Sequence, residues 1–248
     1  MNLVLIGIGL VVGILIGSIG IGGVLLVPSL NYLADVPIHV AIASVMFSYL
    51  FSGMVGATMF ARRGSIRWSM AGWLCLGAMP GAYVGAAAVS MTPAAVLELL
   101  IATIMIAVGV NALIERGEST ADRVWSPRQL MLLGTISGFG SSMTGTGGPL
   151  VLVPILIWLK TPVLMSVGLS QVIQLPIAAL ATVGNWVHGT IDFKLGLMVA
   201  LTLIVGVFVG ARISHAVSSK SLKRLVSLVM VGVGAALVSK IAVHYLAR

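Results

Sequence analysis

The chain has 248 residues, of which 59% are hydrophobic and only 8% are charged. Soluble domains carry about 25% charged residues, so this composition excludes a soluble protein with an ordinary water-facing surface. The net charge is +8, but the Lys and Arg residues lie mostly between apolar runs. That pattern is typical of membrane topology signals and not of a clustered nucleic-acid-binding face. We therefore expect a multi-pass protein of the lipid bilayer with no nucleic-acid partner.

Eight apolar segments follow one another, each about 20 residues long or more, which favours membrane helices over barrel strands. They cover approximately residues 3–33, 38–61, 67–90, 94–114, 129–159, 163–187, 193–216 and 221–246. One polar connector separates the first four segments from the last four. We expect a first membrane repeat at 1–114, a polar cytoplasmic connector at 115–128 and a second membrane repeat at 129–248.

The two halves align at an offset of 125 residues, which indicates an internal duplication. GSIRW at 64–68 matches GTIDF at 189–193, and GAYVGA at 81–86 matches GVFVGA at 206–211. Near the glycine-rich motifs the offset shifts to 126. There the alignment pairs Pro28 with Pro154, Ser44 with Ser170 and Ser48 with Gln174.

Loop charges indicate that the two repeats are inverted. The loop at 62–68 carries three Arg residues, whereas its partner at 188–194 carries one Lys beside Asp192. The loop at 90–98 has no basic residue, whereas its partner at 212–224 has four. Equivalent loops with opposite charge bias should face opposite sides of the membrane, as in an inverted repeat.

Inversion requires an odd number of crossings per repeat, so one of the four elements should be re-entrant. The glycine-broken first element is the candidate, and this arrangement places eleven of the 14 Lys and Arg residues on the cytoplasmic side. Eight full spans would place nine on one side and five on the other. We therefore expect an all-α integral membrane protein of two inverted four-element repeats. Each repeat has a re-entrant first element plus three transmembrane helices. Both termini should lie on the outer side of a bacterial inner membrane.

Two glycine-rich motifs, GIGGVLLVP at 20–28 and TGTGGPLVLVP at 144–154, interrupt the apolar segments. A break inside a membrane is tolerated only where it is buried in protein or lines a cavity. The N-terminus of a half-helix presents free N–H groups and partial positive charge, which suit an anion. Close helix packing through small residues is the alternative. The candidate anion cradle consists of Gly20, Gly22, Gly23, Gly145, Gly147 and Gly148, with the hydroxyls of Thr144 and Thr146 beside it.

Polar side chains also recur on the helix after each motif. Ser44 and Ser48 are spaced to share one helix face, and so are Ser170 and Gln174, with Gln171 beside them. Interhelical hydrogen bonding is the alternative explanation for this pattern. We expect the five side chains to complete a neutral substrate-binding site.

The six acidic residues all lie at predicted helix ends or in loops, and the four His residues lie near helix ends. A proton-coupled carrier usually places a carboxylate or His inside the membrane. No catalytic or metal-binding cluster and no cofactor motif is evident, so an enzyme or an accessory subunit is disfavoured. We expect a secondary transporter of a small anion, with an anion channel of the same lining as the alternative. Homo-oligomerisation stays open.

The paired motifs, each a glycine-rich break that runs into Val-Pro, resemble those of the sulfite exporter TauE/SafE family of membrane transporters. The resemblance covers nearly the whole chain, with eight apolar elements in a duplicated arrangement. It implies transport of a small sulfur-containing anion, such as sulfite or a sulfonate, as exporter or importer. The family motif often has three consecutive glycines, whereas Val24 and Pro149 occupy the third position here.

Overall fold

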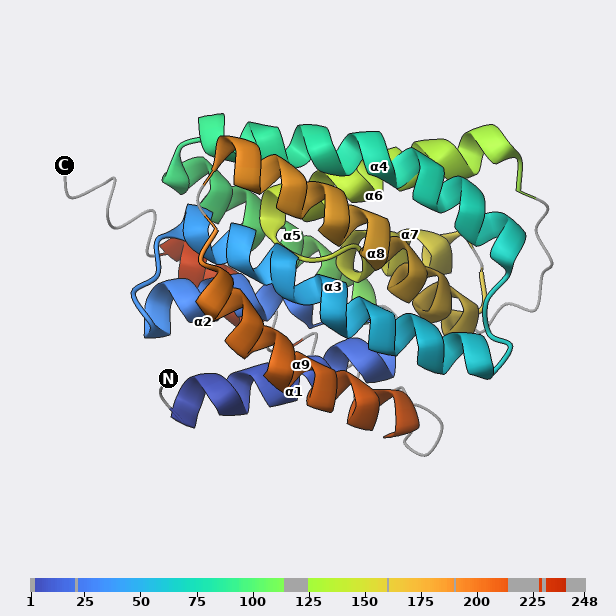
Figure 1. The fold of residues 1–248 in the computed structure, drawn as a ribbon, viewed down its shortest axis with the longest axis horizontal. Helices are drawn as coiled ribbons and strands as arrows, with labels where there is room; N and C mark the ends of the chain where they lie inside the picture. The colour runs from blue at the N-terminus through green and yellow to red at the C-terminus, as the bar shows by residue number, and fades with distance from the viewer. Residues whose placement is uncertain are drawn as a thin grey trace.

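The computed structural model describes residues 3–20, 22–113, 125–159, 161–189, 191–213, 228 and 231–239. Within these ranges the protein is all-helical (Figure 1). The first half contains α1 (Leu3–Ile19), the short 3-10 helix η1 (Gly23–Leu25), α2 (Leu26–Leu33), α3 (Ile38–Arg62), α4 (Trp68–Met91) and α5 (Ala94–Leu113). The second half contains α6 (Pro127–Thr144), α7 (Pro149–Trp158), α8 (Val163–His188) and α9 (Phe193–Ile213).

Each half begins with a broken element, as the sequence predicts. The expected segment 3–33 consists of α1, η1 and α2, and the expected segment 129–159 consists of α6 and α7. Gly22 packs back on α1, because a methyl group at this position would lie 2.8 Å from Leu15 Cβ. In Figure 1 α1 runs from left to right and α2 leads back to the left, whereas α6 runs from right to left and α7 turns back.

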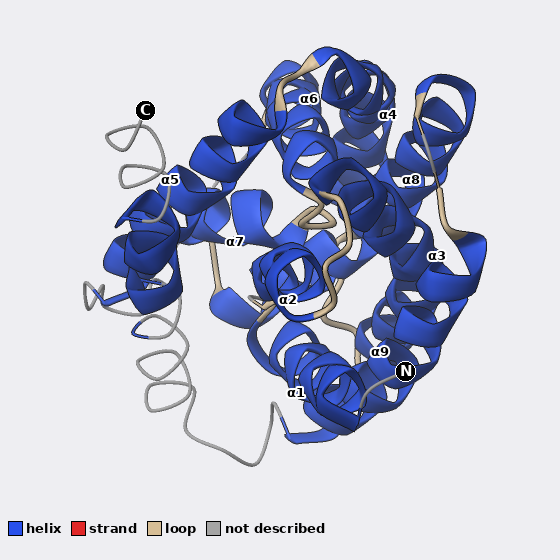
Figure 2. Cartoon of the chain, turned by 90° about the vertical axis from the view of Figure 1, so that its left-hand side faces the viewer, coloured by secondary structure: helices blue, strands red, loops and turns tan. Residues whose placement is uncertain are grey.

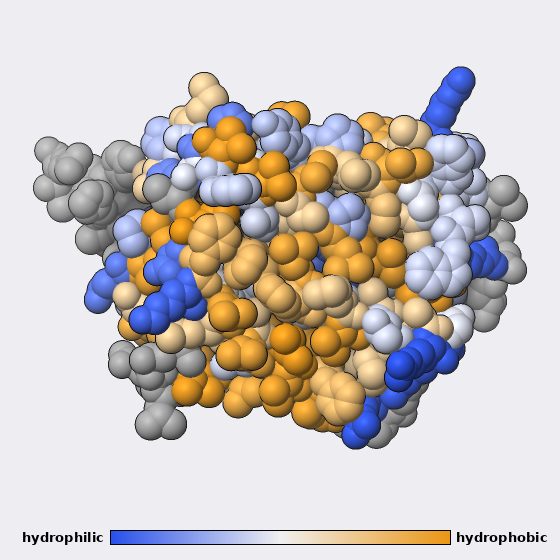
Figure 3. All heavy atoms as spheres, viewed as in Figure 1, coloured by the Kyte–Doolittle hydropathy of each residue, from blue (hydrophilic) through white to orange (hydrophobic). Residues whose placement is uncertain are grey.

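The half-helices lie inside a ring formed by the longer helices. Figure 2, which looks down the long axis, shows α2 near the centre and α7 behind it, surrounded by the other helices. An apolar band covers the middle of the molecule in Figure 3, and hydrophilic residues gather at its two ends. This distribution fits a bilayer whose normal follows the long axis.

Five described helices are long and apolar enough to cross a membrane: α3, α4, α5 through Asn111, α8 from Leu164, and α9. These are five of the six full spans that we expect. The predicted final segment, 221–246, and most of the connector, 115–128, lie outside the described residues. The part of the connector that the structure describes ends in a capping box, in which the Ser126 and Gln129 side chains close the first turn of α6.

Glycine residues set the closest helix pairs, α4 with α6 and α1 with α9. A methyl group at Gly85 of α4 would lie 2.6 Å from Phe139 O of α6. A methyl group at Gly13 of α1 would lie 2.9 Å from Gly206 Cα of α9. Small residues let membrane helices approach until their backbones touch. Each interface joins a helix of one half to a helix of the other.

The two interfaces also contain equivalent glycines. Gly81 and Gly206 differ by 125 positions, and so do Gly13 and Gly138. A Cβ atom at Gly81 would collide with Thr135 O, and a Cβ atom at Gly206 would lie 2.5 Å from Leu10 O. The internal duplication is therefore visible in the packing as well as in the sequence.

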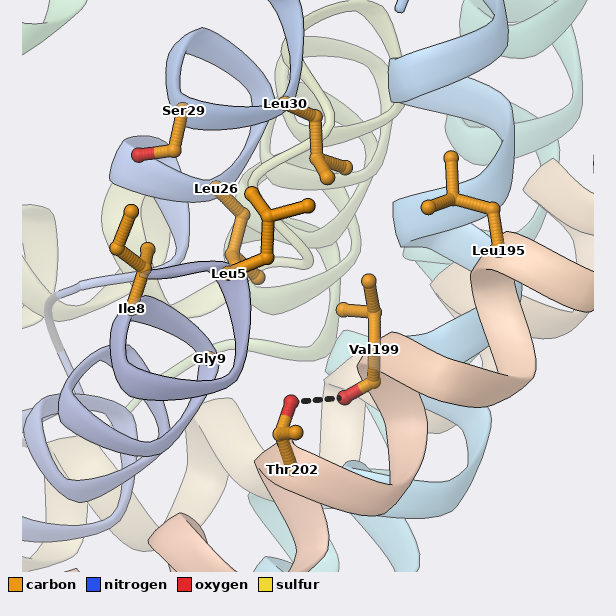
Figure 4. Close-up of a pocket in the computed structure, with 9 residues that line it drawn as sticks. All are labelled: Leu5, Ile8, Gly9, Leu26, Ser29, Leu30, Leu195, Val199 and Thr202. Atoms are coloured by element: carbon orange, nitrogen blue, oxygen red, sulfur yellow. Dashed lines mark hydrogen bonds between the residues drawn. The ribbon is translucent and has the colours of Figure 1, made fainter. Parts of the chain in front are cut away.

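The α2 half-helix packs tightly on its neighbours, whereas α7 borders a groove. The space between α1, α2 and α9 is an apolar cavity of about 10 Å³ with Leu26 and Leu30 on its wall (Figure 4). The groove between α4, α5, α6 and α7 measures about 730 Å³ and is also lined almost entirely by apolar atoms. Its inner wall includes Met143 and Leu150, which flank the second glycine motif.

Candidate functional site

The first glycine turn, which contains Gly20, Gly22 and Gly23, reverses the chain at the end of α1. Gly20 adopts a φ of +70°, a conformation that favours glycine. Its N–H donates to Ile16 O at 3.0 Å and so closes the end of α1. Facing Gly20 from the other half are Val153 of α7 and Val167 of α8, at 3.2 and 3.4 Å from the position of a Cβ atom.

The second glycine turn, residues 145–148, reverses the chain between α6 and α7. Gly145, Gly147 and Gly148 have φ values of +68°, +75° and +107°, so three of its four residues need left-handed backbone. Gly145 N–H closes α6 by donating to Ser141 O, and Thr146 N–H donates to the same oxygen at 3.1 Å. The motif has many glycines because this turn requires their conformational freedom.

Four of the six predicted cradle glycines keep their backbone donors free. The N–H groups of Gly22 and Gly23 donate to no described group, nor do those of Gly147 and Gly148. The N–H groups of Gly20 and Gly145 are already used to close α1 and α6. Free donors at the start of a half-helix are the feature that suits an anion.

The two turns meet, and Tyr49 of α3 joins them. Its hydroxyl donates to Gly23 O at 3.0 Å. Its ring covers Gly147, where a methyl group would lie 2.7 Å from Cδ2. A methyl group at Gly23 would also lie 2.9 Å from Thr146 O, so the turns are in direct contact. Tyr49 is fully buried, and it is not among the site residues that the sequence predicts.

Gln171 and Gln174 of α8 bring two amide groups to the turns. Gln171 Nε2 donates to Ile16 O at 3.0 Å, the oxygen that also accepts from Gly20. Gln174 Nε2 donates to Tyr49 O and to Ser52 Oγ, both at 3.2 Å. Both side chains are completely buried, yet the Oε1 atom of each has no hydrogen-bond donor. Each glutamine therefore offers an unused acceptor.

The predicted hydroxyl groups are buried and mostly bonded to backbone. Ser48 donates to Val45 O at 2.6 Å, and Ser170 donates to Val167 O at 2.7 Å. Ser44 Oγ accepts from Asp192 N at 3.1 Å, which ties it to the connection between α8 and α9. The Ser48 and Ser170 bonds stay within their own helices, and the Ser44 bond reaches the connection before α9, so none of the three is the interhelical bond of the alternative.

Thr144 and Thr146 bond to each other at the second turn. Their Oγ1 atoms lie 3.0 Å apart, and Thr144 Oγ1 also donates to Gly140 O at 2.7 Å. Thr144 is 0% exposed and Thr146 is 3% exposed, so both are enclosed by protein. Nearby, the hydroxyl groups of Ser141 and Ser142 have no hydrogen-bond partner.

The buried interior carries no formal charge in the described part of the chain. Every buried polar side chain there belongs to Ser, Thr, Gln or Asn. The described residues also contain no group of three His, Cys, Asp or Glu side chains that could hold a metal ion. Any ligand at the turns would therefore meet neutral side chains and backbone N–H groups.

Comparison with known proteins identifies the family. The model of the sulfite exporter TauE/SafE family matches residues 5–237, nearly the whole chain. The chain belongs to this family. The family resemblance that the glycine motifs predict is thus confirmed.

Curated relatives carry names of the same class. A protein of Bacillus subtilis (strain 168) named "Probable membrane transporter protein YdhB" is 26% identical over 226 residues, covering 87% of this chain and 91% of the relative. A protein of Methanocaldococcus jannaschii named "Probable membrane transporter protein MJ0441" is 26% identical over 244 residues, covering 91% of each chain. No solved structure matches. The names of the family and its relatives support a membrane transporter and indicate no enzymatic activity.

Proposed function

We propose that this protein is a secondary transporter that binds a small anion between its two glycine turns, an anion such as sulfite or an organosulfonate. One observation carries the proposal: the two turns that hold the unused N–H groups of Gly22, Gly23, Gly147 and Gly148 are in contact in a buried, neutral environment. Each half-helix N-terminus contributes roughly half a positive charge. Thr146, Gln171 and Gln174 would complete the lining.

Helix directions support an inverted repeat as the transport framework. Across the contact of α3 with α8, Gly53 faces Gln174 while Gly56 faces Gln171, so these equivalent helices are antiparallel. By contrast, α1 is parallel to α9, because Gly9 contacts Thr202 and Gly17 contacts Val207. Carriers of this design place substrate at the repeat interface near mid-membrane and alternate by rocking the halves.

The charge distribution supports an orientation with the α3–α4 connection in the cytoplasm. At that end of the molecule, on the right in Figure 1, α3 ends with Arg62 and α4 follows Arg67. At the other end, α9 follows Asp192, and α5 carries Glu98 near its start. Basic residues concentrate on the cytoplasmic side of membrane proteins. Both termini would then lie on the outer side, with the chain in a bacterial inner membrane.

Burial of the lining favours a carrier over an open channel. Gln171 and Gln174 are 0% exposed and Thr146 is 3% exposed, so the turns are closed from both ends. A carrier passes through such an occluded arrangement between its two open states, whereas a conducting channel needs a continuous path. The contact of Tyr49 with both turns provides the closure.

Flux measurements in proteoliposomes test the proposal. Purified protein should accelerate sulfite exchange over protein-free vesicles, and the rate should saturate with concentration. Thr146→Val, which keeps the branched shape and removes the hydroxyl, should weaken apparent affinity by roughly tenfold, as expected for one lost buried hydrogen bond. The matched control is Thr58→Val, because the Thr58 hydroxyl donates to Met54 O on an exposed part of α3.

Two results would count against the transporter. One is flux no faster than in empty vesicles for sulfite, sulfoacetate and thiosulfate alike. The other is flux that rises linearly without saturation together with single-channel currents, which would indicate the channel instead. Equal affinities for Thr146→Val and Thr58→Val would remove Thr146 from the lining while leaving the rest of the proposal standing.

A further inference from the structure

The groove between α4, α5, α6 and α7 opens to the side of the molecule and is separate from the proposed anion site. Its volume of about 730 Å³ lies within the range of pockets that hold drug-sized ligands, roughly 300–1,000 Å³. Val84 and Phe139 at its rim are exposed, whereas Met143 and Leu150 at its floor are buried. Figure 2 shows α5 at the edge of the molecule and α7, which carries Leu150, further in. The groove therefore leads from the lateral surface inward.

Apolar atoms line the groove, so water is excluded as its occupant. Of the described lining residues, Thr135 alone has a polar side chain, and its hydroxyl already bonds to backbone, 2.9 Å from Gly77 O and 3.0 Å from Met131 O. An apolar cavity stays dry. On α4 and α5 the lining residues lie at mid-length, within 80–84 and 100–108, at the level of the apolar band in Figure 3. At that depth the groove opens to the acyl chains of the bilayer.

A glycine of α6 leaves part of this space open. Gly140 lines the groove, and a methyl group placed there would meet Val151 Cγ2 at 3.7 Å, an ordinary contact distance. The equivalent position of α1, 125 residues earlier, is Leu15, whose side chain is buried and packs against Gly22. The second half of the chain therefore leaves open a position that a leucine fills in the first half.

The described C-terminal stretch, residues 231–239, packs on a different face of α5. There Gly234 lies against Ala102 O and the Met105 side chain. None of these residues lines the groove, whose wall on α5 consists of Leu100, Ile104, Ala107 and Val108. Helical spacing places these four residues on the opposite side of α5 from Ala102 and Met105.

The shape of the groove favours a thin occupant over a helix from a second copy of the protein. A helix with its side chains is about 10–12 Å across. It would rest on the exposed rim at Val84 and Phe139 and would not reach the buried floor at Leu150. A single acyl chain is narrow enough to enter and to contact the floor.

A cation lies on α6 beyond one end of the groove. Arg128 is in the first turn of α6 and shares a helix face with Thr135 and Phe139, seven and eleven residues further on. The helical rise places Arg128 about 10 Å from Thr135 along the axis, toward the end of the molecule where Arg62 and Arg67 lie. Arg128 is exposed and has no partner among the described residues. A guanidinium group suits phosphate, and basic pockets between membrane helices bind lipid head groups.

We infer that the groove binds a phospholipid, with one acyl chain between the helices and the phosphate at Arg128. An anionic lipid such as phosphatidylglycerol fits best, because its head group has no ammonium group to repel the guanidinium. The chain contacts Leu150 and Pro154 on one face of α7, while Leu152 and Leu156 on the other face belong to the core shared with α8. The lipid thereby supports the half-helix that follows the second glycine turn. This site holds whatever ligand the glycine turns bind.

Native mass spectrometry of the intact protein in a mild detergent tests the site. The wild type should retain one phosphatidylglycerol per chain, and phosphatidylethanolamine should bind roughly tenfold more weakly, as expected for the loss of one favourable charged contact. Added phosphatidylglycerol should also raise the unfolding temperature, because a ligand that binds the folded state stabilises it.

Two variants separate the acyl chain from the head group. Gly140→Leu fills the groove and should weaken phosphatidylglycerol binding by tenfold or more, and the open space at this position lets the variant fold. The matched control is Gly72→Leu, which adds the same side chain at an exposed position of α4 with nothing within 4 Å and should bind as the wild type does. Arg128→Gln should abolish the preference for phosphatidylglycerol over phosphatidylethanolamine. It should not weaken α6, because a cation in the first turn of a helix is unfavourable.

Three results would overturn the inference. One is a wild type that retains no phosphatidylglycerol, and another is equal binding by Gly140→Leu and Gly72→Leu. The third is a wild-type dimer that Gly140→Leu dissociates, which would assign the groove to a second copy of the chain. An unchanged lipid preference in Arg128→Gln would overturn the assignment of the phosphate to this residue. Sulfite flux is a separate measurement, so each of these results leaves the proposed function standing.

Discussion

Tyr49 joins the two glycine turns, one from each half of the chain. It belongs to the first half, yet its ring covers Gly147 of the second half while its hydroxyl bonds to Gly23 of the first. The backbone carbonyl of Tyr49 accepts from Gln174, which lies 125 positions further on. If the two halves are related by an axis, as the proposed inverted repeat requires, equivalent residues touch only near that axis, and Tyr49 and Gln174 would mark the centre of the molecule.

Tyr49→Phe should destabilise the protein without altering the packing of the ring. The Gly23 carbonyl also accepts from Leu26 N–H, so it would lose one of its two donors, which costs about 0.5–1.5 kcal/mol. The measurement is the unfolding temperature in detergent. The control is Tyr83→Phe, because Tyr83 is 38% exposed and its hydroxyl donates to no described group. Equal melting temperatures for the two variants would mean that the Tyr49 hydroxyl does not hold the turns together.

At the scale of helices, the protein is held together by pairs from different halves. Glycines of α4 pack against backbone carbonyl groups of α6, and glycines of α6 pack against backbone carbonyl groups of α4. The glycines of α1 and α9 contact each other's carbonyl groups in the same way. In a bilayer, apolar packing against lipid is no worse than packing against protein, so close van der Waals contact must provide the association energy. A methyl group at these glycines removes that contact.

Gly81→Ala and Gly206→Ala should each lower stability by about 1–3 kcal/mol, because the added methyl group meets backbone atoms that cannot move aside. Gly72→Ala is the control on α4: nothing lies within 4 Å of its Cβ position, and alanine favours the helix. Reversible unfolding in mixed detergent micelles provides the comparison. A loss for Gly81→Ala without a loss for Gly206→Ala would show that the two interfaces are not equivalent in energy.

At the scale of the whole molecule, hydropathy and the duplication predicted most of the helix order. Apolar segments must form helices in a bilayer, and glycine clusters are costly inside helices, so both breaks could be located in advance. The extent of each half-helix was harder to predict. The expected start of the second repeat at 129 lies two residues inside α6, because the Ser126 capping box begins the helix at Pro127.

The residue pairs at the candidate site differ from those of the sequence alignment by a shift of one position. The alignment paired Ser48 with Gln174, an offset of 126. In the structure α3 and α8 begin after Pro37 and Pro162 with the same backbone angles, φ −53° and ψ 139°, an offset of 125. The one-residue shift is confined to the half-helices, where Val27 faces Gly145 and Val153 faces Gly20. When the offset between α3 and α8 is corrected from 126 to 125, the residue equivalent to Gln174 is Tyr49.

Which backbone donors stay free could not be predicted from sequence, since it depends on how each turn closes its helix. Gly20 and Gly145 belong to the same glycine-rich motifs as Gly22 and Gly147. However, the N–H groups of Gly20 and Gly145 close the ends of α1 and α6. The orphaned acceptors of Gln171 and Gln174 depend on contacts between helices that are distant in the chain. Such contacts appear only once the halves are packed together.

The proposed inverted arrangement makes a prediction for the whole molecule. Ser69, the second residue of α4, and Lys194, the second residue of α9, differ by 125 positions and are both exposed. If the repeats are inverted, equivalent residues lie on opposite sides of the membrane. In a Cys75→Ala background, which removes the single cysteine, Ser69→Cys should react with an impermeant maleimide only from the cytoplasmic side.

Lys194→Cys should react only from the outer side, because α9 begins at the end of the molecule where the acidic residues Asp192 and Glu98 lie. The measurement compares labelling in intact spheroplasts with labelling in inside-out vesicles. Labelling of both positions from one side would mean that the repeats are parallel, and a rocking mechanism between oppositely oriented halves would then be excluded. If Ser69→Cys reacted only from the outer side and Lys194→Cys only from the cytoplasmic side, the repeats would still be inverted. The protein would then have the opposite orientation in the membrane, contrary to the charge bias of its two ends.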